Sequence, residues 1–161
     1  MDEDGFWKIV QSAHDSSGGD MDQKCAALRR QVAALSKKDA PEFARLFDAK
    51  MDQAYSWPLW GAAYVINGGC SDDSFTDFRA ALISRGRQAF ERAIADPDSL
   101  ADEDFDEGDW FYEGYQYAVT DGVEAVAGTR PQRSAPGQPS GTEWREDAVY
   151  ALFPKLSGKF G

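Results

Sequence analysis

The sequence is poor in the residues that build metal centres and disulfide frameworks. It holds two cysteines, Cys25 and Cys70, in no paired spacing, and a single histidine, His14. A zinc site of the usual kind needs four ligands, more than these residues supply. Two scattered cysteines are typical of reduced thiols in the cytoplasm, and a Cys25–Cys70 bridge is the alternative. We therefore expect a cytoplasmic protein with no metal and no cofactor.

Long apolar runs and a surplus of basic residues are also missing. No segment approaches the roughly 20 apolar residues of a membrane span, and no basic start followed by an apolar stretch predicts a signal peptide. The 17 Lys and Arg residues are outnumbered by 28 Asp and Glu residues, which leaves a net charge of −11. This charge disfavours binding to a phosphate backbone. We expect no nucleic-acid and no membrane partner.

The apolar residues recur at helical rather than strand spacing. With 161 residues, of which 42% are hydrophobic, the chain suits one core and a monomer by default. The pattern predicts an all-α fold: a single compact domain over 1–161, with six or seven helices. Residues 128–141 are rich in Pro, Gly and Ser and predict a long loop near the C-terminus.

Capping residues suggest where the predicted helices begin and end. Asp20 and Asp39 are expected to cap the second and third helices, and Ser71 to start a long helix that ends near residue 95. The apolar run 59–66 predicts a central buried helix. Thr142 is expected to cap a last short helix.

The negative charge is concentrated in one part of the chain. Residues 96–127 hold eleven acids and no base, so their charge equals that of the whole protein. We call residues 96–109 the acidic segment. It predicts a surface for a protein partner with a basic surface, with carboxylates that steer the encounter and Trp110 as an aromatic anchor. The predicted acidic contacts are Asp102, Asp104, Asp106 and Glu107.

Four other interpretations of the acidic segment stay open. It can be a solvated loop whose aromatic neighbours face the core, or a carboxylate row that mimics nucleic acid. It can also dock against the basic side chains of the long helix predicted before it, which are Arg79, Arg85, Arg87 and Arg92. It can also be a calcium loop with Asp102, Asp104, Asp106 and Glu113, although Glu107 stands where the loop's turn favours glycine.

A dense motif in residues 57–79 offers the alternative of a small enzyme of unassigned class. The catalytic candidates are Cys70, Asp72 and Asp73, beside an expected polar pocket at the Asn67–Asp73 turn formed by Trp60, Tyr64, Asn67 and Arg79. Paired carboxylates can divide acid and base duties, and a thiol can pair with His14 as a nucleophile. The structural alternative is that Ser71 and the two carboxylates cap a helix and complement its dipole.

The same motif resembles a known family. The runs Leu59–Tyr64 (LWGAAY) and Ile66–Asp73 (INGGCSDD), followed by Pro97–Leu100 (PDSL), are similar to the bacterial domain-of-unknown-function 4240 family. The resemblance implies a mostly helical domain over nearly the whole chain, a bacterial origin and a cytoplasmic location. The family has no settled activity, so the resemblance implies no catalytic residue.

Overall fold

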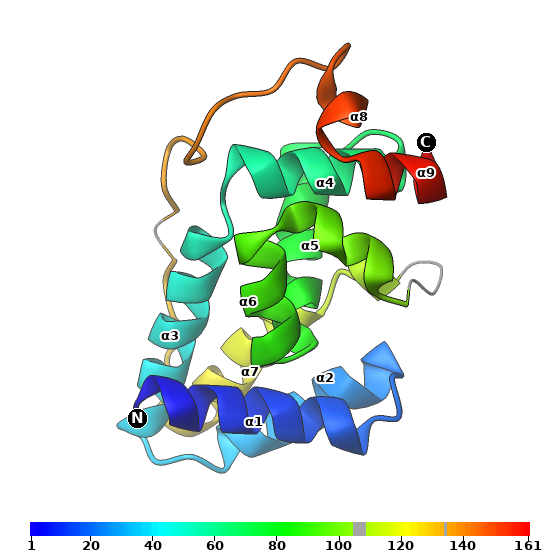
Figure 1. Ribbon diagram of the computed structural model, residues 1–161. Coiled ribbons are helices and arrows are strands. Elements are labelled where there is room, and N and C mark those ends of the chain that lie inside the picture. The colour runs from blue at the N-terminus through cyan, green and yellow to red at the C-terminus, as the bar shows by residue number, and fades with distance from the viewer. Residues whose placement is uncertain (105–108, 134) are drawn as a thin grey trace.

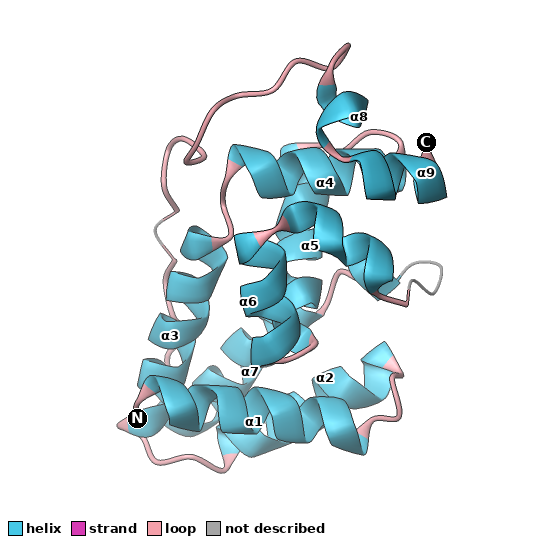
Figure 2. Ribbon diagram, viewed as in Figure 1, coloured by secondary structure: helices cyan, strands magenta, loops and turns pink. Residues whose placement is uncertain are grey.

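The computed structural model describes residues 1–104, 109–133 and 135–161. In these ranges the chain folds into helices, which confirms the predicted all-α class (Figures 1 and 2). The elements in chain order are α1 (Glu3–Ser16), α2 (Met21–Ala33), α3 (Asp39–Gln53), α4 (Trp57–Asn67), α5 (Asp72–Ser84), α6 (Arg87–Ala95), the 3₁₀-helices η1 (Pro97–Asp102) and η2 (Asp109–Phe111), α7 (Tyr115–Ala127), α8 (Val149–Leu152) and α9 (Pro154–Phe160). No helix in these ranges is long and apolar enough to cross a membrane.

Side-chain caps begin several of the helices as the sequence predicts. The Asp20 carboxylate accepts a hydrogen bond from the Gln23 amide at 3.0 Å, and the Ser71 hydroxyl accepts one from the Ser74 amide at 3.2 Å. Each bond satisfies an amide that has no partner within the first turn of its helix. Gly68 ends α4 at φ 67°, a conformation that glycine adopts without a steric cost.

The prediction for the start of α3 was wrong. Asp39 is the first residue of the helix rather than its cap, and the preceding Lys38 makes no capping bond. The Asp39 amide instead donates to the Ser36 hydroxyl at 3.0 Å.

One predicted helix is broken in two, and a further helix follows the last predicted one, so the described residues hold more helices than predicted. The long helix over 71–95 ends at Ser84, and α6 starts at Arg87 after Gly86, whose φ of 103° no continuous helix allows. The last helix does not begin at Thr142, because residues up to Ala148 are not helical. Phe153 then separates α8 from α9.

The centre of the core is α5 rather than α4. In α5 a continuous stretch from Phe78 to Ser84 is buried, and Figure 1 shows the helix surrounded by the others. The predicted central helix, α4, buries one face, while Trp60 and Tyr64 on its other face are half-exposed. The apolar run 59–66 is explained by the aromatic neighbours that cover this second face.

Some of these neighbours, Trp144 and Tyr150, come from the C-terminal part of the chain. The chain from α7 to α8 runs beside α3 and over α4 (Figure 1), and its described residues 129–133 and 135–148 form no helix. Trp144 packs on α4, where its indole Nε1 donates to the Trp57 carbonyl oxygen at 2.6 Å. Asp98 accepts bonds from the Lys155 and Leu156 amides at 3.1 and 2.9 Å, and so caps α9.

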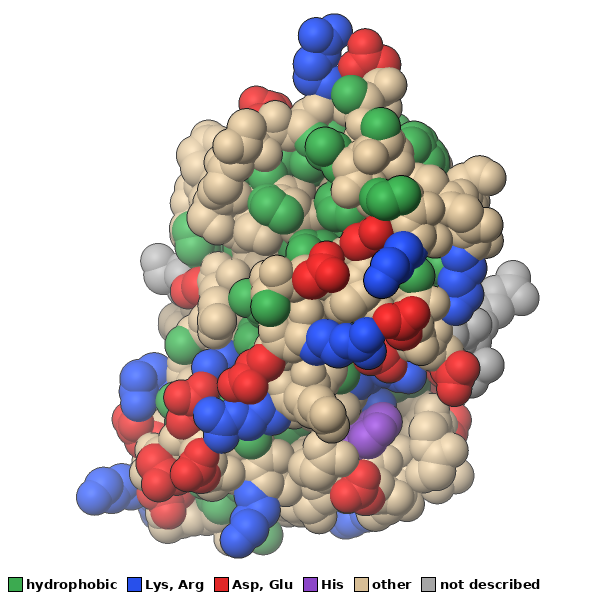
Figure 3. Space-filling view, viewed as in Figure 1, with side chains coloured by type: hydrophobic (Ala, Val, Ile, Leu, Met, Phe, Trp, Pro, Cys, Tyr) green, Lys and Arg blue, Asp and Glu red, His purple; other side chains and the backbone are tan. Residues whose placement is uncertain are grey.

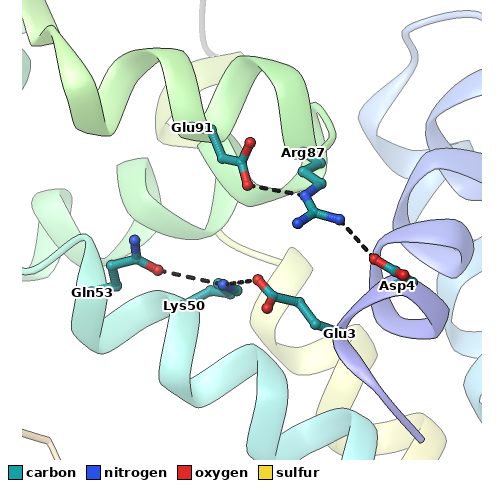
Figure 4. Close-up of polar contacts among 6 residues, drawn as sticks. All are labelled: Glu3, Asp4, Lys50, Gln53, Arg87 and Glu91. Atoms are coloured by element: carbon teal, nitrogen blue, oxygen red, sulfur yellow. Dashed lines mark hydrogen bonds and ion pairs between the residues drawn. The ribbon is translucent and has the colours of Figure 1, made fainter.

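Ion pairs on the surface tie α1 to its neighbours (Figure 4). The Lys50 amine on α3 lies 2.5 Å from Glu3, and the Arg87 guanidinium on α6 lies 2.8 Å from Asp4. The Lys50 amine holds the pKa of the Glu3 carboxyl below its usual value. Charges of both signs are interspersed over this part of the surface, and apolar side chains gather near α4 and α8 (Figure 3). The −11 charge is therefore not exposed on this face as one acidic field.

Among the described helices, α2 and α7 pack against each other most extensively, and this packing depends on a glycine. A Cβ atom placed on Gly122 would lie 2.9 Å from Val32 Cβ and 3.1 Å from the Arg29 carbonyl oxygen. Neither atom is the end of a flexible chain, so the two helices would have to separate.

We expect Gly122→Ala to lower the free energy of unfolding by about 1–3 kcal/mol, because overpacking outweighs the higher helix propensity of alanine. Denaturant unfolding followed by circular dichroism measures this. The matched control is Gly158→Ala in α9, where a new Cβ meets nothing within 4 Å and the stability should hold or rise. Equal effects of the two substitutions would contradict the packing argument.

Candidate functional site

The Asn67–Asp73 turn uses its polar groups to hold its own backbone. The Asn67 amide donates to the Gly69 carbonyl oxygen at 2.9 Å, and the Trp60 indole donates to the Cys70 carbonyl oxygen at 3.0 Å. Together with the Ser71 cap, these bonds fix the step from α4 into α5. Asn67 and Trp60, two of the predicted pocket residues, therefore have structural roles here.

Cys70, the predicted nucleophile, lies in an environment that favours the protonated thiol. Burial raises the pKa of Cys70 to about 12, and the Asp72 carboxylate adds to the rise. Only the thiolate is a good nucleophile, and almost none is present at neutral pH. The charged groups that act on His14 are Lys24, Arg85 and Asp15. The structure thus does not bring His14 and Cys70 together as a catalytic pair.

The other predicted pocket residues pack against aromatic rings. Trp60 is stacked on Trp57 and on Phe75, with ring centroids 5.2 Å away in both cases. Tyr64 packs against Trp144, and Arg79, which is 3% exposed, lies over the Tyr55 ring. The shared polar pocket at this turn stays a prediction.

The acidic segment is only partly free to meet a partner. Asp102 forms an ion pair with Arg92 at 2.6 Å, so docking against a base of α6, one of the four alternatives, is seen at this residue. The backbone carbonyl oxygen of Asp104 accepts hydrogen bonds from Arg85 at 3.3 Å and from the Trp110 indole at 3.1 Å. The predicted contacts Asp106 and Glu107 lie outside the described residues.

Trp110 is not an exposed anchor. Its side chain is 2% exposed and stacks on Phe78 of α5, with ring centroids 5.7 Å apart. The Arg85 guanidinium lies 4.5 Å from the centre of its ring. An aromatic ring flanked in this way stabilises the core, so the prediction for Trp110 was wrong. The acids around it do not make it a surface residue.

Other acids of residues 96–127 are balanced by Arg130. This guanidinium lies 2.8 Å from the Asp121 carboxylate and 3.5 Å from that of Glu124. The alternative of a calcium loop includes Asp106, which lies outside the described residues. Within the described residues there is no group of three or more acids, cysteines or histidines placed to hold a metal ion.

One set of carboxylates lacks a cation in the described part of the chain. Asp73 and Asp77 lie one turn apart on α5, and Glu113 lies just before α7. With Thr76, Gln116 and Tyr117 they line a space of about 360 Å³, which we call the acidic hollow. No ion pair to a described residue balances these three acids. Burial raises the pKa of Asp77, and the charges of Glu113 and Asp73 raise it further.

Tyr117 stands at the edge of this hollow and is one of the few large apolar side chains on the surface. It is 46% exposed. It also borders a space of about 150 Å³ between α3 and α7, which we call the apolar cleft. Apolar walls of this cleft come from Ala44, Phe47, Val119 and Pro131, and its polar lining residues are Asp48, Gln116, Thr120, Arg130 and Arg133. Tyr117 therefore borders both an acidic and an apolar depression, and we call its exposed side chain the ridge.

The sequence predicted roles for Asp73, as a catalytic candidate, and for Glu113, as a residue of a calcium loop, but did not predict this surface. A signal existed, since Asp73 and Asp77 are four residues apart and therefore share one face of a helix. Glu113 and Tyr117 follow the acidic segment in the chain, and the sequence does not reveal which way they face. Only the packing of α7 against α5 and α3 brings these residues together.

The helices and this surface define an all-α protein with a group of carboxylates that form no ion pair to a described residue. Residues 1–124 match the family model described as "Protein of unknown function (DUF4240)", and the chain belongs to this family. The match ends within α7. The segment that contains Trp144 and packs over α4 therefore lies outside the matched residues. No curated protein and no solved structure matches the chain.

Proposed function

We propose that this protein is an acidic protein-interaction module that binds a partner with a basic surface, as an adaptor or as the immunity-type partner of a toxin. The observation that carries the proposal is the acidic hollow, where three carboxylates surround a space without a balancing cation from the described residues. A bacterial origin, a cytoplasmic location and a monomeric state belong to the same proposal, and rest on the sequence.

The physical argument is the cost of placing like charges together. Burial raises the pKa of Asp77, and the charges of Glu113 and Asp73 raise it further, so both burial and repulsion disfavour its ionised form. A cationic group from a partner would relieve this repulsion. The relief makes the free energy of binding more favourable. The net charge of −11 also steers a basic partner toward the protein and speeds association.

The proposal is tested with three labelled peptides of equal length: one rich in Arg and Lys, one uncharged and one rich in Asp and Glu. We expect the protein to bind the basic peptide at least about tenfold more tightly than the uncharged one, and to lose affinity as salt is raised. Fluorescence anisotropy measures both effects. Equal affinity for the basic and the uncharged peptide, or an affinity for the basic peptide that does not change with salt concentration, would contradict the proposal.

A further inference from the structure

The two depressions beside Tyr117 differ in chemistry, and together they define what can bind there. The acidic hollow lies between α5 and the start of α7, and the apolar cleft lies between α3 and α7. Tyr117 borders both, so a ligand that contacts its ring can reach into each of them. A segment of a partner chain that crosses this ridge can place one side chain in each depression.

The acidic hollow suits a guanidinium group better than a metal ion. Within the part of the chain that the structure describes, no group of three potential ligands converges closely enough for a metal. A guanidinium is larger and planar and has five donors, so it can bridge carboxylates that are too far apart for one ion. The carboxylates of Asp77 and Glu113 line the hollow as acceptors, and the ring of Tyr117 adds a cation–π surface.

The apolar cleft suits one uncharged side chain. Its volume of about 150 Å³ is that of a cavity able to hold a benzene-sized group. The charges at its mouth are already balanced: Arg133 lies 2.5 Å from Asp52 and 3.4 Å from Asp48, and Arg130 is paired as described above. The cleft therefore offers a ligand apolar contact rather than net charge.

We propose that the Tyr117 surface, comprising the ridge, the acidic hollow and the apolar cleft, binds a peptide segment in which an arginine lies close to an aliphatic or aromatic residue. The arginine enters the acidic hollow, and the apolar side chain enters the cleft. This inference rests on the proposed function and adds where the basic partner binds and what it must carry.

The test uses a set of labelled synthetic peptides. Each carries one leucine and one arginine, separated by a varying number of residues in a Gly/Ser background. We expect at least one spacing to bind, and its Arg→Gln and Leu→Ser versions each to bind at least about fivefold more weakly. Failure of every spacing to bind more tightly than its Arg→Gln version would overturn the inference.

Variants of the protein locate the binding. The double variant Asp77→Asn/Glu113→Gln should bind the leucine–arginine peptide about tenfold more weakly than the wild type does. Its affinity for the Arg→Gln version of the peptide should be unchanged, because the carboxylates interact with the arginine. Tyr117→Ser should weaken both peptides. The control with the same charge change is Glu143→Gln/Glu146→Gln, at two exposed acids for which the structure shows no ion pair. Circular dichroism confirms that each variant is folded.

The outcomes separate this inference from the proposed function. If basic peptides bind but are weakened by Asp102→Asn/Asp104→Asn and not by the Asp77 and Glu113 variant, the function stands and the site is wrong. If the control variant weakens binding as much as the hollow variant, the attraction is diffuse and the site is again wrong. If no basic peptide binds at all, both proposals fall.

Discussion

Arg79→Ala is expected to lower the free energy of unfolding by about 2–4 kcal/mol, although the substitution removes a buried charge. The guanidinium donates hydrogen bonds to the carbonyl oxygens of Met51 at 2.9 Å and Phe75 at 3.4 Å, and to the Thr76 hydroxyl at 3.2 Å. It also lies 4.5 Å from the ring centre of Tyr55. Removing it leaves a buried carbonyl at the end of α3 without its donor and opens a void.

Two further substitutions separate these causes. Arg79→Met fills much of the volume without donors, so the loss of stability that remains is due to the hydrogen bonds. Arg79→Lys keeps one donor group but lacks the planar fork, and should lie between the wild type and the alanine variant. Chemical denaturation under two-state conditions provides the comparison. A neutral effect of Arg79→Ala would show that the desolvation cost of the charge cancels the stabilisation from its contacts, and would contradict the prediction.

Lys24→Met is expected to have the opposite sign and to raise the free energy of unfolding by about 2–3 kcal/mol at pH 7. Lys24 is 1% exposed, and among the described residues its amine donates one hydrogen bond, to the Ser84 hydroxyl at 3.3 Å. That hydroxyl donates to the Ala81 carbonyl oxygen at 2.6 Å and so remains satisfied in the variant. Burial, followed by the nearby charge of Arg85, lowers the pKa of Lys24 to about 8, although the Asp109 carboxylate opposes this shift.

The pH dependence identifies the cause. In the unfolded chain the amine has its ordinary pKa of 10.5, so between about pH 8 and 10.5 the unfolded state binds more protons than the folded state. The penalty for the buried charge is complete below pH 8 and disappears as the pH rises through this window. The advantage of Lys24→Met over the wild type should therefore shrink toward zero by about pH 10.5.

Comparison with the wild type at each pH is essential, because buried thiols titrate in the same range. Burial raises the pKa of Cys25 to about 11, which lowers the stability of both proteins as the pH rises above 9. Lys8→Met, at an exposed position of α1, is the control and should change stability by less than about 0.5 kcal/mol. A Lys24→Met variant less stable than the wild type at pH 7 would show that the attraction of Asp109 dominates.

Helix content and several helix ends could be predicted from local sequence. Asp20, Ser71 and Gly68 act through groups within four residues of themselves, so their effect does not depend on the rest of the fold. The break at Gly86 was missed, because a glycine inside a regular apolar pattern is compatible with a continuous helix until the neighbouring helices are placed.

The candidate site was less predictable than the fold. The acidic segment was recognised by its composition, but composition does not tell whether a carboxylate faces a base, as Asp102 faces Arg92. Trp110 lies among acids in the sequence and nevertheless stacks in the core. Tyr117 is the opposite case. It lies among aromatic residues in the sequence, as a core residue would, but its side chain is exposed.

The sequence alone determined that the chain is helical, that it carries a large negative charge and where several of its helices begin. These properties come from residue types and from contacts a few positions apart along the chain. Only the tertiary structure decided which carboxylates are neutralised, which aromatic rings are buried and that Asp77, Glu113 and Tyr117 border one hollow. Such properties depend on distances between residues far apart in the chain, and these distances exist only once the helices have packed.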